Sequence, residues 1–480
     1  MPKLENLNPQ RVFYYFEKLS AVPRGSGNTE GIAEFCEDFA VQHNLRYIRD
    51  NADNVVIFKN SSVGYENSKP VILQGHLDMV CQKTEESTVD FEKDGLELCV
   101  DGDFVFANGT TLGADNGIAV AMILAILESD SIAHPPIEAV FTSDEEIGMI
   151  GAVKLDKSVL NGKQMINLDS EEDGTVTVSC AGGREFRVNI PIGYIAKQGT
   201  KLTFKLKGLK GGHSGVEIHK GRVNANLLAG RILNHIKNEC VFDIISVNGG
   251  DKSNAITNNF TAELCVYDAQ KFCIKAEEYF NVVKNEICDR EEDFTAEILI
   301  NGDSEYTVFN EETKNKIIFT LCCVPDGVIQ MSAKIEGLVE TSLNLGVLKT
   351  QNDNVVLHFS LRSNKQTSLD ALEERLATFF ASQNLAYETF GHYPPWEYKE
   401  NSRLCEIYKQ TYFEQCKKEP KVEAIHAGLE CGVFAKAIKD FDCIAIGPAL
   451  YDVHTVNEKL SISSTENLYN LMIEILKKLK

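Results

Sequence analysis

Apolar residues in the first 180 positions follow two periods in turn. They recur with helical spacing over 9–20, 31–43 and 118–129, and they form short, mainly apolar runs over 54–60, 71–75, 137–144 and 164–170. Short apolar runs bounded by turn residues are typical of buried strands, and helical spacing is typical of helices that pack on them. This alternation predicts an α/β sheet with helices on both faces.

The pattern changes near Gly183, where polar and apolar residues begin to alternate one by one. The alternation is clear in REFRVNIPI (184–192), TKLTFKLKG (200–208) and NNFTAELCVYD (258–268). Strands with one solvated face in an antiparallel sheet have this pattern. More strands are expected at 328–337, 341–350 and 354–363, with helices at 221–238, 271–287 and 368–383. This part of the chain is therefore predicted to be a separate α+β domain.

The first pattern returns around 388–397 and continues to the end of the chain. Helices are expected at 401–416 and 464–480, and strands at 421–427 and 443–448. We therefore predict a discontinuous α/β domain, 1–185 plus 386–480, with a mostly parallel sheet flanked by helices. An inserted α+β domain, 186–385, interrupts it.

Composition and charge narrow the function classes. The 480 residues are 43% apolar and 25% charged, and the net charge is −22. Such an acidic chain lacks the basic surface that nucleic-acid binding needs, and no apolar run reaches the 18 residues of a membrane span. The 14 cysteines include no Cys-x-x-Cys pair, and the polar start lacks the apolar core of a signal peptide. We expect a cytoplasmic protein with reduced thiols and no nucleic-acid or membrane partner.

Ionisable side chains gather where the predicted strands of the first domain end. His76 and Asp78 directly follow the run 71–75. Other strand ends and loops of this domain carry Asp115, Asp144, Glu145, Glu146, Asp169 and His454. Because the carboxyl ends of strands form the binding crevice of an open α/β sheet, these side chains are expected to converge.

Histidine nitrogens together with carboxylate oxygens suit zinc, cobalt or manganese. Two histidines and three carboxylates are too many for one catalytic ion, but they fit two ions bridged by a shared carboxylate. Each residue alone has a plainer interpretation, since Asp115 can cap a helix and residues 144–146 can form a solvated turn. The repetition at five strand ends argues against coincidence and favours a metal site.

Six segments, taken in order, resemble the M20 family of metallopeptidases. They are GHLDMV (75–80), GTTLGADNGIAVAM (109–122), FTSDEEIGMIGA (141–152), NLDSEEDG (167–174), GGHSG (211–215) and YDVHTVNE (451–458). CQK (81–83) and HPPIEAVFTSDEEIGM (134–149) resemble the aminoacyl-histidine dipeptidase branch of that family. The resemblance implies that the discontinuous domain is a catalytic di-metal domain. It also implies that 186–385 is a lid and dimerisation domain of a homodimer.

The resemblance also implies a set of metal ligands. Two Zn²⁺ ions per subunit are expected, with Co²⁺ or Mn²⁺ as possible substitutes. His76 and Asp169 would bind one ion, Glu146 and His454 the other, and Asp115 would bridge them. The peptide bond that follows Asp115 is expected to be cis.

Three further residues are assigned catalytic roles by the resemblance. Glu145 would be the general base that moves a proton from water to the leaving amine. Asp78 would orient the imidazole of His76, as partners of metal-bound histidines usually do. His213, in the glycine-rich GGHSG segment, would reach a substrate oxyanion, often in the site of the neighbouring subunit.

Substrate contacts are expected from four other residues. Arg362 could pair with the C-terminal carboxylate of the substrate, and Asn254 could bond the same end. His426 and Glu430, in HAGLECG (426–432), would line the pocket. The sequence has NAIT (254–257) where the family pattern has a proline after NAI, a departure that weakens the assignment of Asn254.

The function that these residues imply is that of a metallo-exopeptidase acting on dipeptides with a free N-terminus, Xaa-His and broader. An N-acyl amino acid deacylase of the same superfamily is the first alternative, because it would share the metal motifs. A non-catalytic binding protein is the second. The presence of Glu145 with all the metal ligands argues against that second alternative.

Overall fold

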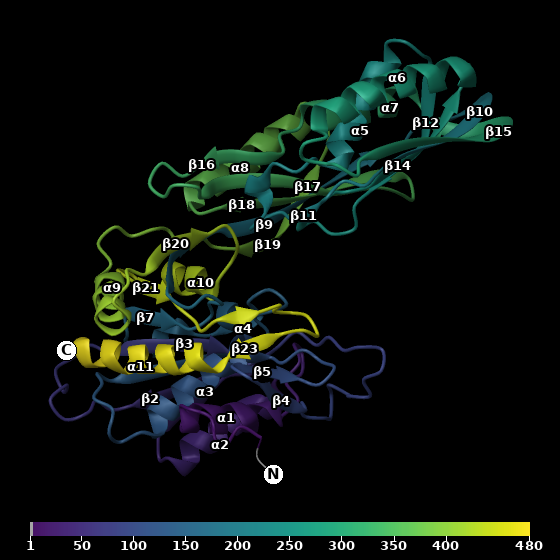
Figure 1. The fold of residues 1–480 in the computed structure, drawn as a ribbon. Coiled ribbons are helices and arrows are strands. Elements are labelled where there is room, and N and C mark those ends of the chain that lie inside the picture. Colours follow the sequence, from purple (N-terminus) through teal and green to yellow (C-terminus); the bar gives the residue numbers. More distant parts are fainter. Residues whose placement is uncertain (1–2) are drawn as a thin grey trace. The chain divides into compact units, whose positions relative to one another are not determined.

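The computed structural model describes residues 3–480, which fall into two compact units (Figure 1). Unit 1 contains the chain up to Cys180, together with Trp396–Ala424 and Leu429–Lys480. Unit 2 contains Ala181–Pro395 and the short segment Ile425–Gly428. In the part of the chain that is described, no helix is both long and apolar enough to cross a membrane.

Unit 1 is built on an eight-stranded sheet in the order β1-β2-β6-β3-β7-β21-β8-β20. Its strands are β1 (Arg46–Arg49), β2 (Val55–Lys59), β6 (Ile137–Thr142), β3 (Val71–His76), β7 (Gln164–Asn167), β21 (Asp442–Ala445), β8 (Thr175–Cys180) and β20 (Lys421–Ile425). The four central strands β6, β3, β7 and β21 run parallel, whereas β1, β2 and β8 pair antiparallel. The predicted α/β sheet is therefore present, with parallel pairing at its centre and antiparallel pairing toward its edges.

The helices of unit 1 lie along this sheet (Figure 1). They are α1 (Gln10–Ser20), α2 (Glu30–Gln42), α3 (Ala114–Glu128), α4 (Ile150–Lys154), α9 (Arg403–Cys416), α10 (Glu430–Ala437) and α11 (Ile462–Lys478), with a 3₁₀ turn at Lys157–Val159. A small four-stranded sheet adds β22 (Leu450–Tyr451), β23 (Lys459–Ser461), β5 (Phe104–Ala107) and β4 (Leu98–Asp101), in that order. The sequence pattern predicts none of the strands in this small sheet.

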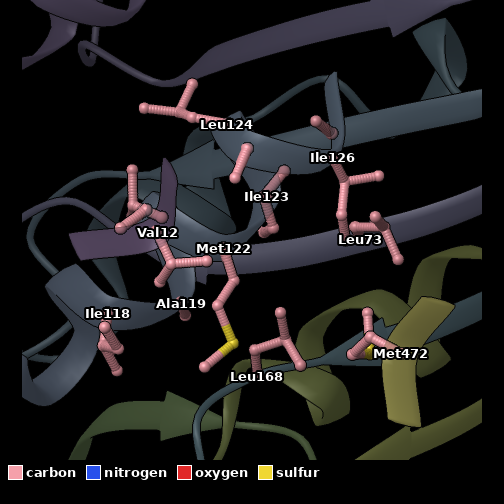
Figure 2. Packing of buried hydrophobic residues seen from close by; sticks show 14 of the residues in the cluster. Val12, Leu73, Ile118, Ala119, Met122, Ile123, Leu124, Ile126, Leu168 and Met472 are labelled. Carbon is pink, nitrogen blue, oxygen red and sulfur yellow. The ribbon is translucent and has the colours of Figure 1, made fainter. Parts of the chain in front are cut away.

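Helix α3 is the centre of the core of unit 1. Every residue from Asn116 to Leu127 is buried, and a helix that is apolar on all sides must be enclosed by other elements. Figure 2 shows its side chains among Val12 of α1, Leu73 of β3 and Met472 of α11. Because α3 is enclosed in this way, the residues at its N-terminus have a fixed position in unit 1.

Unit 2 is built on a nine-stranded antiparallel sheet in the order β15-β10-β14-β12-β17-β18-β9-β19, with β16 paired to β17. The strands are β15 (Thr295–Phe309), β10 (Tyr194–Lys207), β14 (Phe260–Val266), β12 (Phe242–Gly249), β17 (Val339–Gln351), β18 (Asn354–Ser363), β9 (Gly182–Pro191), β19 (Tyr387–Tyr393) and β16 (Gly327–Met331). A two-stranded ladder joins β11 (Gly212–His213) to β13 (Ala255–Ile256). The predicted antiparallel pairing is confirmed.

Helices cover one face of the unit 2 sheet (Figure 1). They are α5 (Ala225–Lys237), α6 (Ala269–Ile287), α7 (Glu311–Cys323) and α8 (Gln366–Ala381), with a 3₁₀ turn at Ile218–Lys220. Helix α7 and the long edge strand β15 were not predicted. The first turn of α7 is almost entirely polar, and β15 is exposed along most of its length, so neither has a regular apolar period.

Candidate metal centre

The predicted ligands of unit 1 lie at one edge of its sheet. His76 is the last residue of β3, while Glu145 and Glu146 follow β6 and Asp169 follows β7. Strands β6, β3 and β7 are adjacent and parallel, so their carboxyl ends lie side by side. Asp115 enters from the N-terminus of α3. His454 enters from the loop between β22 and β23.

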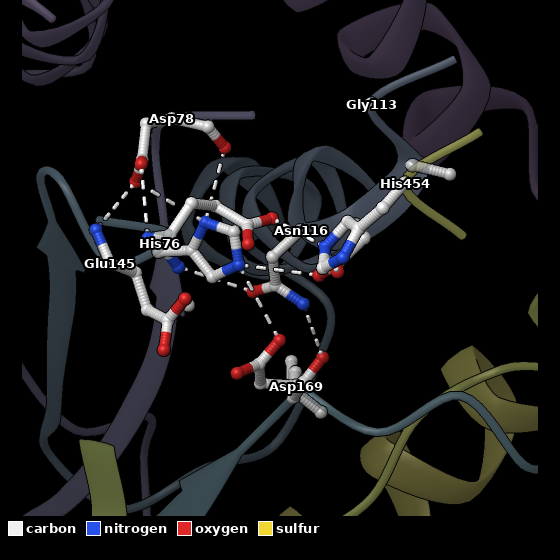
Figure 3. Close-up of polar contacts among 12 residues, drawn as sticks. His76, Asp78, Gly113, Asn116, Glu145, Asp169 and His454 are labelled. Carbon is white, nitrogen blue, oxygen red and sulfur yellow. Dashed lines mark hydrogen bonds and ion pairs between the residues drawn. The ribbon is translucent and has the colours of Figure 1, made fainter. Parts of the chain in front are cut away.

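Asp115 contacts both histidines, His76 and His454, which are labelled in Figure 3. Its Oδ1 is 3.2 Å from Nε2 of His76, and its Oδ2 is 3.2 Å from Nε2 of His454. His454 Nε2 is also 2.9 Å from Oε1 of Glu146. On the other side, His76 Nε2 is 3.5 Å from Oδ1 of Asp169. The five predicted ligands thus form one continuous cluster centred on Asp115.

The spacing of this cluster fits metal coordination. Ligand atoms about 2.0–2.1 Å from a tetrahedral ion lie roughly 3.3 Å from one another. The nitrogen–oxygen distances in the cluster are 2.9–3.5 Å, and ligand atoms of His76, Asp115 and Glu146 all lie within 4.8 Å of one another. The two oxygens of Asp115 face different histidines, which is the arrangement of a carboxylate shared by two ions.

Burial and charge make the ionisation of these groups interdependent. Burial alone would lower the pKa of His76, but the carboxylates of Asp115, Asp169 and Asp78 outweigh it and hold this pKa well above its usual range. Bonds to Asp115 and Glu146 raise the pKa of His454 to about 11. Burial raises the pKa of Asp169 to about 6. A cluster this rich in negative charge favours cations.

Asp78 lies behind His76 and is completely buried. Its Oδ1 is 3.4 Å from Nδ1 of His76, on the opposite side of the ring from Asp115. The same carboxylate accepts hydrogen bonds from the Ser26 hydroxyl at 2.7 Å and from the Glu145 backbone N–H at 2.9 Å. Asp78 therefore connects the ring of His76 to the segment that carries Glu145 (Figure 3).

Asn116 connects the backbone segments that carry two of the proposed ligands, His76 and Asp169. Its Oδ1 accepts from the backbone N–H of His76 at 3.1 Å, and its Nδ2 donates to the carbonyl of Leu168 at 2.8 Å. The peptide bond between Asp115 and Asn116 is cis, as expected. The sequence reasoning did not identify Asn116, because an amide next to a predicted helix start has many ordinary uses.

Glu145 is held by its backbone N–H on Asp78, and its carboxyl group lies among other acids. Burial raises its pKa well above the usual range, and the negative charges of Asp169, Glu430 and Glu146 add to this, while His76 opposes it. A carboxyl group with a raised pKa beside a candidate metal site is the type of group that serves as a general base.

Glu430 is the predicted substrate residue that belongs to unit 1. It is fully buried at the start of α10, and its Oε2 accepts from the Gln74 amide at 2.5 Å and from the Thr142 hydroxyl at 2.7 Å. Burial raises its pKa to about 7. The side chain thus ties α10 to strands β3 and β6, and a direct contact with substrate stays a prediction.

The other predicted substrate residues, and His213, belong to unit 2. The Nδ1 of His213 accepts from the backbone N–H groups of Gly215 and Val216, at 3.1 and 3.2 Å. Burial and the charge of Arg362 lower the pKa of His213. Its imidazole is therefore neutral near pH 7 and carries its proton on Nε2, so it can donate one hydrogen bond.

Arg362 and His426 are buried in the same unit. Arg362 donates from Nη1 to the Tyr393 hydroxyl at 2.9 Å. His426 bonds Ser342 through Nε2 at 2.7 Å and Asn364 through Nδ1 at 3.2 Å. Asn254, by contrast, is exposed, and its backbone carbonyl accepts from the backbone N–H of Ser214 at 2.9 Å.

Two buried residues of the site were missed by the sequence reasoning. Glu458 accepts from the backbone N–H groups of residues 112–115, and Arg24 donates to the carbonyls of Leu77 and Asp78. Both lie in loops without periodicity, so one sequence holds no signal for their positions. Only Glu458 lies within a segment that the resemblance covers.

Comparisons with known proteins agree with this geometry. The profile of the family described as Peptidase family M20/M25/M40 matches residues 72–478. The chain is 37% identical to the cytosol non-specific dipeptidase of Escherichia coli (strain K12) over 483 residues, which is 100% of this chain and 99% of that protein. It is also similar to the crystal structure of aminoacylhistidine dipeptidase from Vibrio alginolyticus, with a TM-score of 0.91, 34% identity and coverage of 99% and 98%. The aminopeptidase PepT of Bacillus cereus shares the fold, with a TM-score of 0.57, 14% identity and coverage of 98% and 99%.

Proposed function

The chain belongs to peptidase family M20/M25/M40, and from this premise we propose that it is a metallo-dipeptidase that hydrolyses dipeptides with a free N-terminus, Xaa-His among them. The observation that carries the proposal is Asp115, whose two oxygens face one histidine each within a cluster of carboxylates. The two full-length relatives with 37% and 34% identity are named as dipeptidases, which favours dipeptides as the substrate class.

Two Zn²⁺ ions per subunit fit this cluster, and Co²⁺ or Mn²⁺ are possible substitutes. We propose His76 and Asp169 as ligands of one ion, Glu146 and His454 as ligands of the other, and Asp115 as the bridge. When bound, such ions lower the pKa of water and polarise the scissile carbonyl.

Glu145 and Asp78 supply the groups that move and hold protons. Glu145 takes a proton from the attacking water and gives it to the amine that leaves. Nδ1–H of His76 lies 3.1 Å from the backbone carbonyl oxygen of Asp78 and 3.4 Å from its carboxylate, so Asp78 engages this side of the ring and leaves Nε2 free to bind a cation. The bond from the Glu145 backbone to Asp78 keeps these two functions in a fixed relation.

Unit 2 supplies groups suited to binding a dipeptide. The Nε2–H of His213 is a donor for an oxyanion, because its Nδ1 is already engaged by backbone N–H groups. Arg362 carries a charge that suits the C-terminal carboxylate of the substrate. Asn254, His426 and Glu430 are proposed as further substrate-binding residues. Residues 186–385 are proposed to act as lid and to join two copies in a homodimer.

We place the enzyme in the cytoplasm, in line with the cytosolic relative from Escherichia coli and with 14 cysteines that are all free. An N-acyl amino acid deacylase stays the first alternative, because the proposed ligands would serve both reactions. A non-catalytic binding protein is the second alternative.

The test compares a free dipeptide ending in histidine with its N-acetylated form. Each is offered to the purified protein before chelation, after chelation and after zinc is added back. Zinc-dependent cleavage of the free form alone is the expected result. Cleavage of the acetylated form alone would make the protein a deacylase, and cleavage of neither, with metal bound, would support the binding-protein alternative.

A further inference from the structure

Glu458 is a buried carboxylate four residues beyond the proposed ligand His454. It lies in the same loop, between β22 and β23, and is 2% exposed. Its Oε2 accepts from the backbone N–H groups of Leu112 and Gly113 at 2.8 and 2.9 Å. Its Oε1 accepts from those of Ala114 and Asp115 at 2.8 and 3.2 Å. One carboxylate thus binds four consecutive N–H groups.

Leu112 and Gly113 directly precede α3, and Ala114 and Asp115 are its first two residues, with Asp115 outside helical geometry. None of these four N–H groups can therefore be satisfied within the helix. The partial positive charge of a helix N-terminus and the negative charge of Glu458 attract one another, and hydrogen bonds to a carboxylate are stronger than neutral ones. The backbone of residues 112–115 is therefore fixed relative to the loop of Glu458. That loop also carries His454. The hydrogen bonds of Glu458 therefore restrain the backbone of Asp115 relative to that of His454.

Arg24 links a third segment, Leu77 and Asp78, to residues 112–115. It is 2% exposed and donates from Nη1 to the carbonyls of Leu77 and Asp78 at 3.0 and 3.3 Å. From Nη2 it donates to the carbonyl of Gly113. The segment after His76 is thus tied through Arg24 to Gly113, whose N–H group is bound by Glu458.

We propose that Glu458 is a positioning residue that holds Asp115 in line with His454 and so sets the affinity of the centre for its second metal ion. This inference rests on the proposed function for the identity of the centre, but it is tested by metal binding and needs no substrate. The four hydrogen bonds that Glu458 accepts all come from the backbone of residues 112–115, so it acts on the proposed ligand Asp115 through the main chain.

The test is Glu458→Gln, which keeps the shape of the side chain but replaces one acceptor oxygen by an amide that faces two N–H donors. Zn²⁺ affinity is measured by titration against a competing chelator. The coordination of bound Co²⁺ is followed in the visible absorption spectrum of the Co²⁺-loaded protein. Loss of a group that orients metal ligands typically weakens metal affinity about 10- to 100-fold. We expect this loss for the second equivalent of Zn²⁺, an altered Co²⁺ spectrum, and a lower kcat with KM nearly unchanged.

Glu138→Gln is the matched control. Glu138 is also a buried carboxylate of unit 1, 3% exposed, and accepts from the backbone N–H groups of Asn161 and Gly162 at 2.9 Å. It lies at the start of β6, whereas the metal ligands follow the end of that strand. This variant is expected to lose stability and to keep the Zn²⁺ affinity and Co²⁺ spectrum of the unchanged protein.

The proposal is overturned if Glu458→Gln resembles the control, with lower stability but unchanged Zn²⁺ affinity and Co²⁺ spectrum. Should Glu458→Gln not fold, Glu458→Asp replaces it, since it keeps both oxygens on a shorter stem. For Glu458→Asp we expect a loss of Zn²⁺ affinity that is smaller than tenfold. Full Zn²⁺ affinity with an unchanged Co²⁺ spectrum would contradict the proposal. Failure of the proposed function is detected separately: the unchanged protein would then bind metal but cleave no dipeptide.

Discussion

His76 and Asp78 stand two residues apart at the end of β3, and their environment explains why a buried strand ends in two ionisable side chains. Asp78 faces one nitrogen of the ring and Asp115 faces the other, so the imidazole is held between two carboxylates. Neither acid would be stable there without the cationic or hydrogen-bonding partner that the other residues provide. At the residue scale, each side chain of the site is thus oriented by contacts with particular neighbouring side chains.

Replacing Glu145 by Gln tests the proposed base. Loss of a general base typically costs about 100- to 10,000-fold in turnover, and the ligands of the metal are untouched. We expect that loss in kcat with full metal content, measured on the same preparation by metal analysis. Glu172→Gln, at an exposed carboxylate paired with Lys421, should keep near-normal turnover. Near-normal turnover of Glu145→Gln would remove Glu145 from the mechanism.

His426 predicts a specific dependence of stability on pH. Burial, aided by the charge of Arg362, lowers its pKa to about 3. An unfolded histidine has a pKa near 6.5, so the unfolded chain takes up a proton below that pH while the folded protein does not. Stability is therefore fully present above pH 6.5 and is lost as the pH falls toward 3, by about 2 kcal/mol between pH 7.5 and 5.

Urea unfolding at pH 7.5 and pH 5 checks this dependence. The stability gap between the unchanged protein and His426→Gln is expected to narrow by about 2 kcal/mol at the lower pH, since the variant lacks the titrating group. Val41→Ala, at an exposed position without a titrating group, is the control and should show a gap that does not change with pH. A constant gap for His426→Gln as well would mean that His426 titrates normally when folded.

At the scale of elements, α3 and the strand ends around it decide where the chemistry can take place. The helix is apolar on all sides and packs against α1, β3 and α11 (Figure 2). Its first turn bears Asp115 and Asn116, so the packing of its middle fixes the position of its start. The parallel strands β6, β3 and β7 then place three further segments at the same edge.

Leu124→Ala in the middle of α3 tests how strongly this packing stabilises unit 1. Leu124 is completely buried, and such a truncation typically costs 2–5 kcal/mol in the free energy of unfolding. We expect a loss of about that size in denaturant unfolding. Val41→Ala on α2 is the control, because Val41 is 58% exposed and should change stability by less than about 0.5 kcal/mol. Equal effects of the two variants would contradict the central role of α3.

At the scale of the whole molecule, the chain forms two units with separate cores. The proposed metal ligands all belong to unit 1, whereas His213, Arg362 and His426 belong to unit 2. A short segment, Ile425–Gly428, comes from the C-terminal part of the chain but groups with unit 2. Stabilisation by metal should therefore act on one unit directly.

Removal of metal tests this division. A ligand that binds only the folded state stabilises it by about 4 kcal/mol when present at 1,000 times its dissociation constant. Chelation is expected to lower the unfolding temperature of unit 1, and calorimetry of the chelated and zinc-restored protein measures it. A transition assigned to unit 2 should move little. If chelation leaves every transition in place, the clustered side chains do not hold a metal in the folded protein.

The sequence by itself determined the α/β and α+β character of the chain, the helices α1, α2 and α5, and the residue types at the strand ends. These features are local, because the period of apolar residues reports which face of an element is buried. It did not predict α7 or β15, whose apolar residues have no regular period. The roles of the strand-end residues came from the resemblance and stay predictions for the experiments above.

Only the tertiary structure decided how these residues are held together. The carboxylate of Glu458 binds N–H groups that precede it by as many as 346 residues, and Arg24 reaches a carbonyl 89 residues away. Contacts of this kind depend on how distant loops meet, and they leave no periodic trace in one sequence. Local patterns place a histidine or an acid at the end of a strand, but long-range packing decides which atoms face each other.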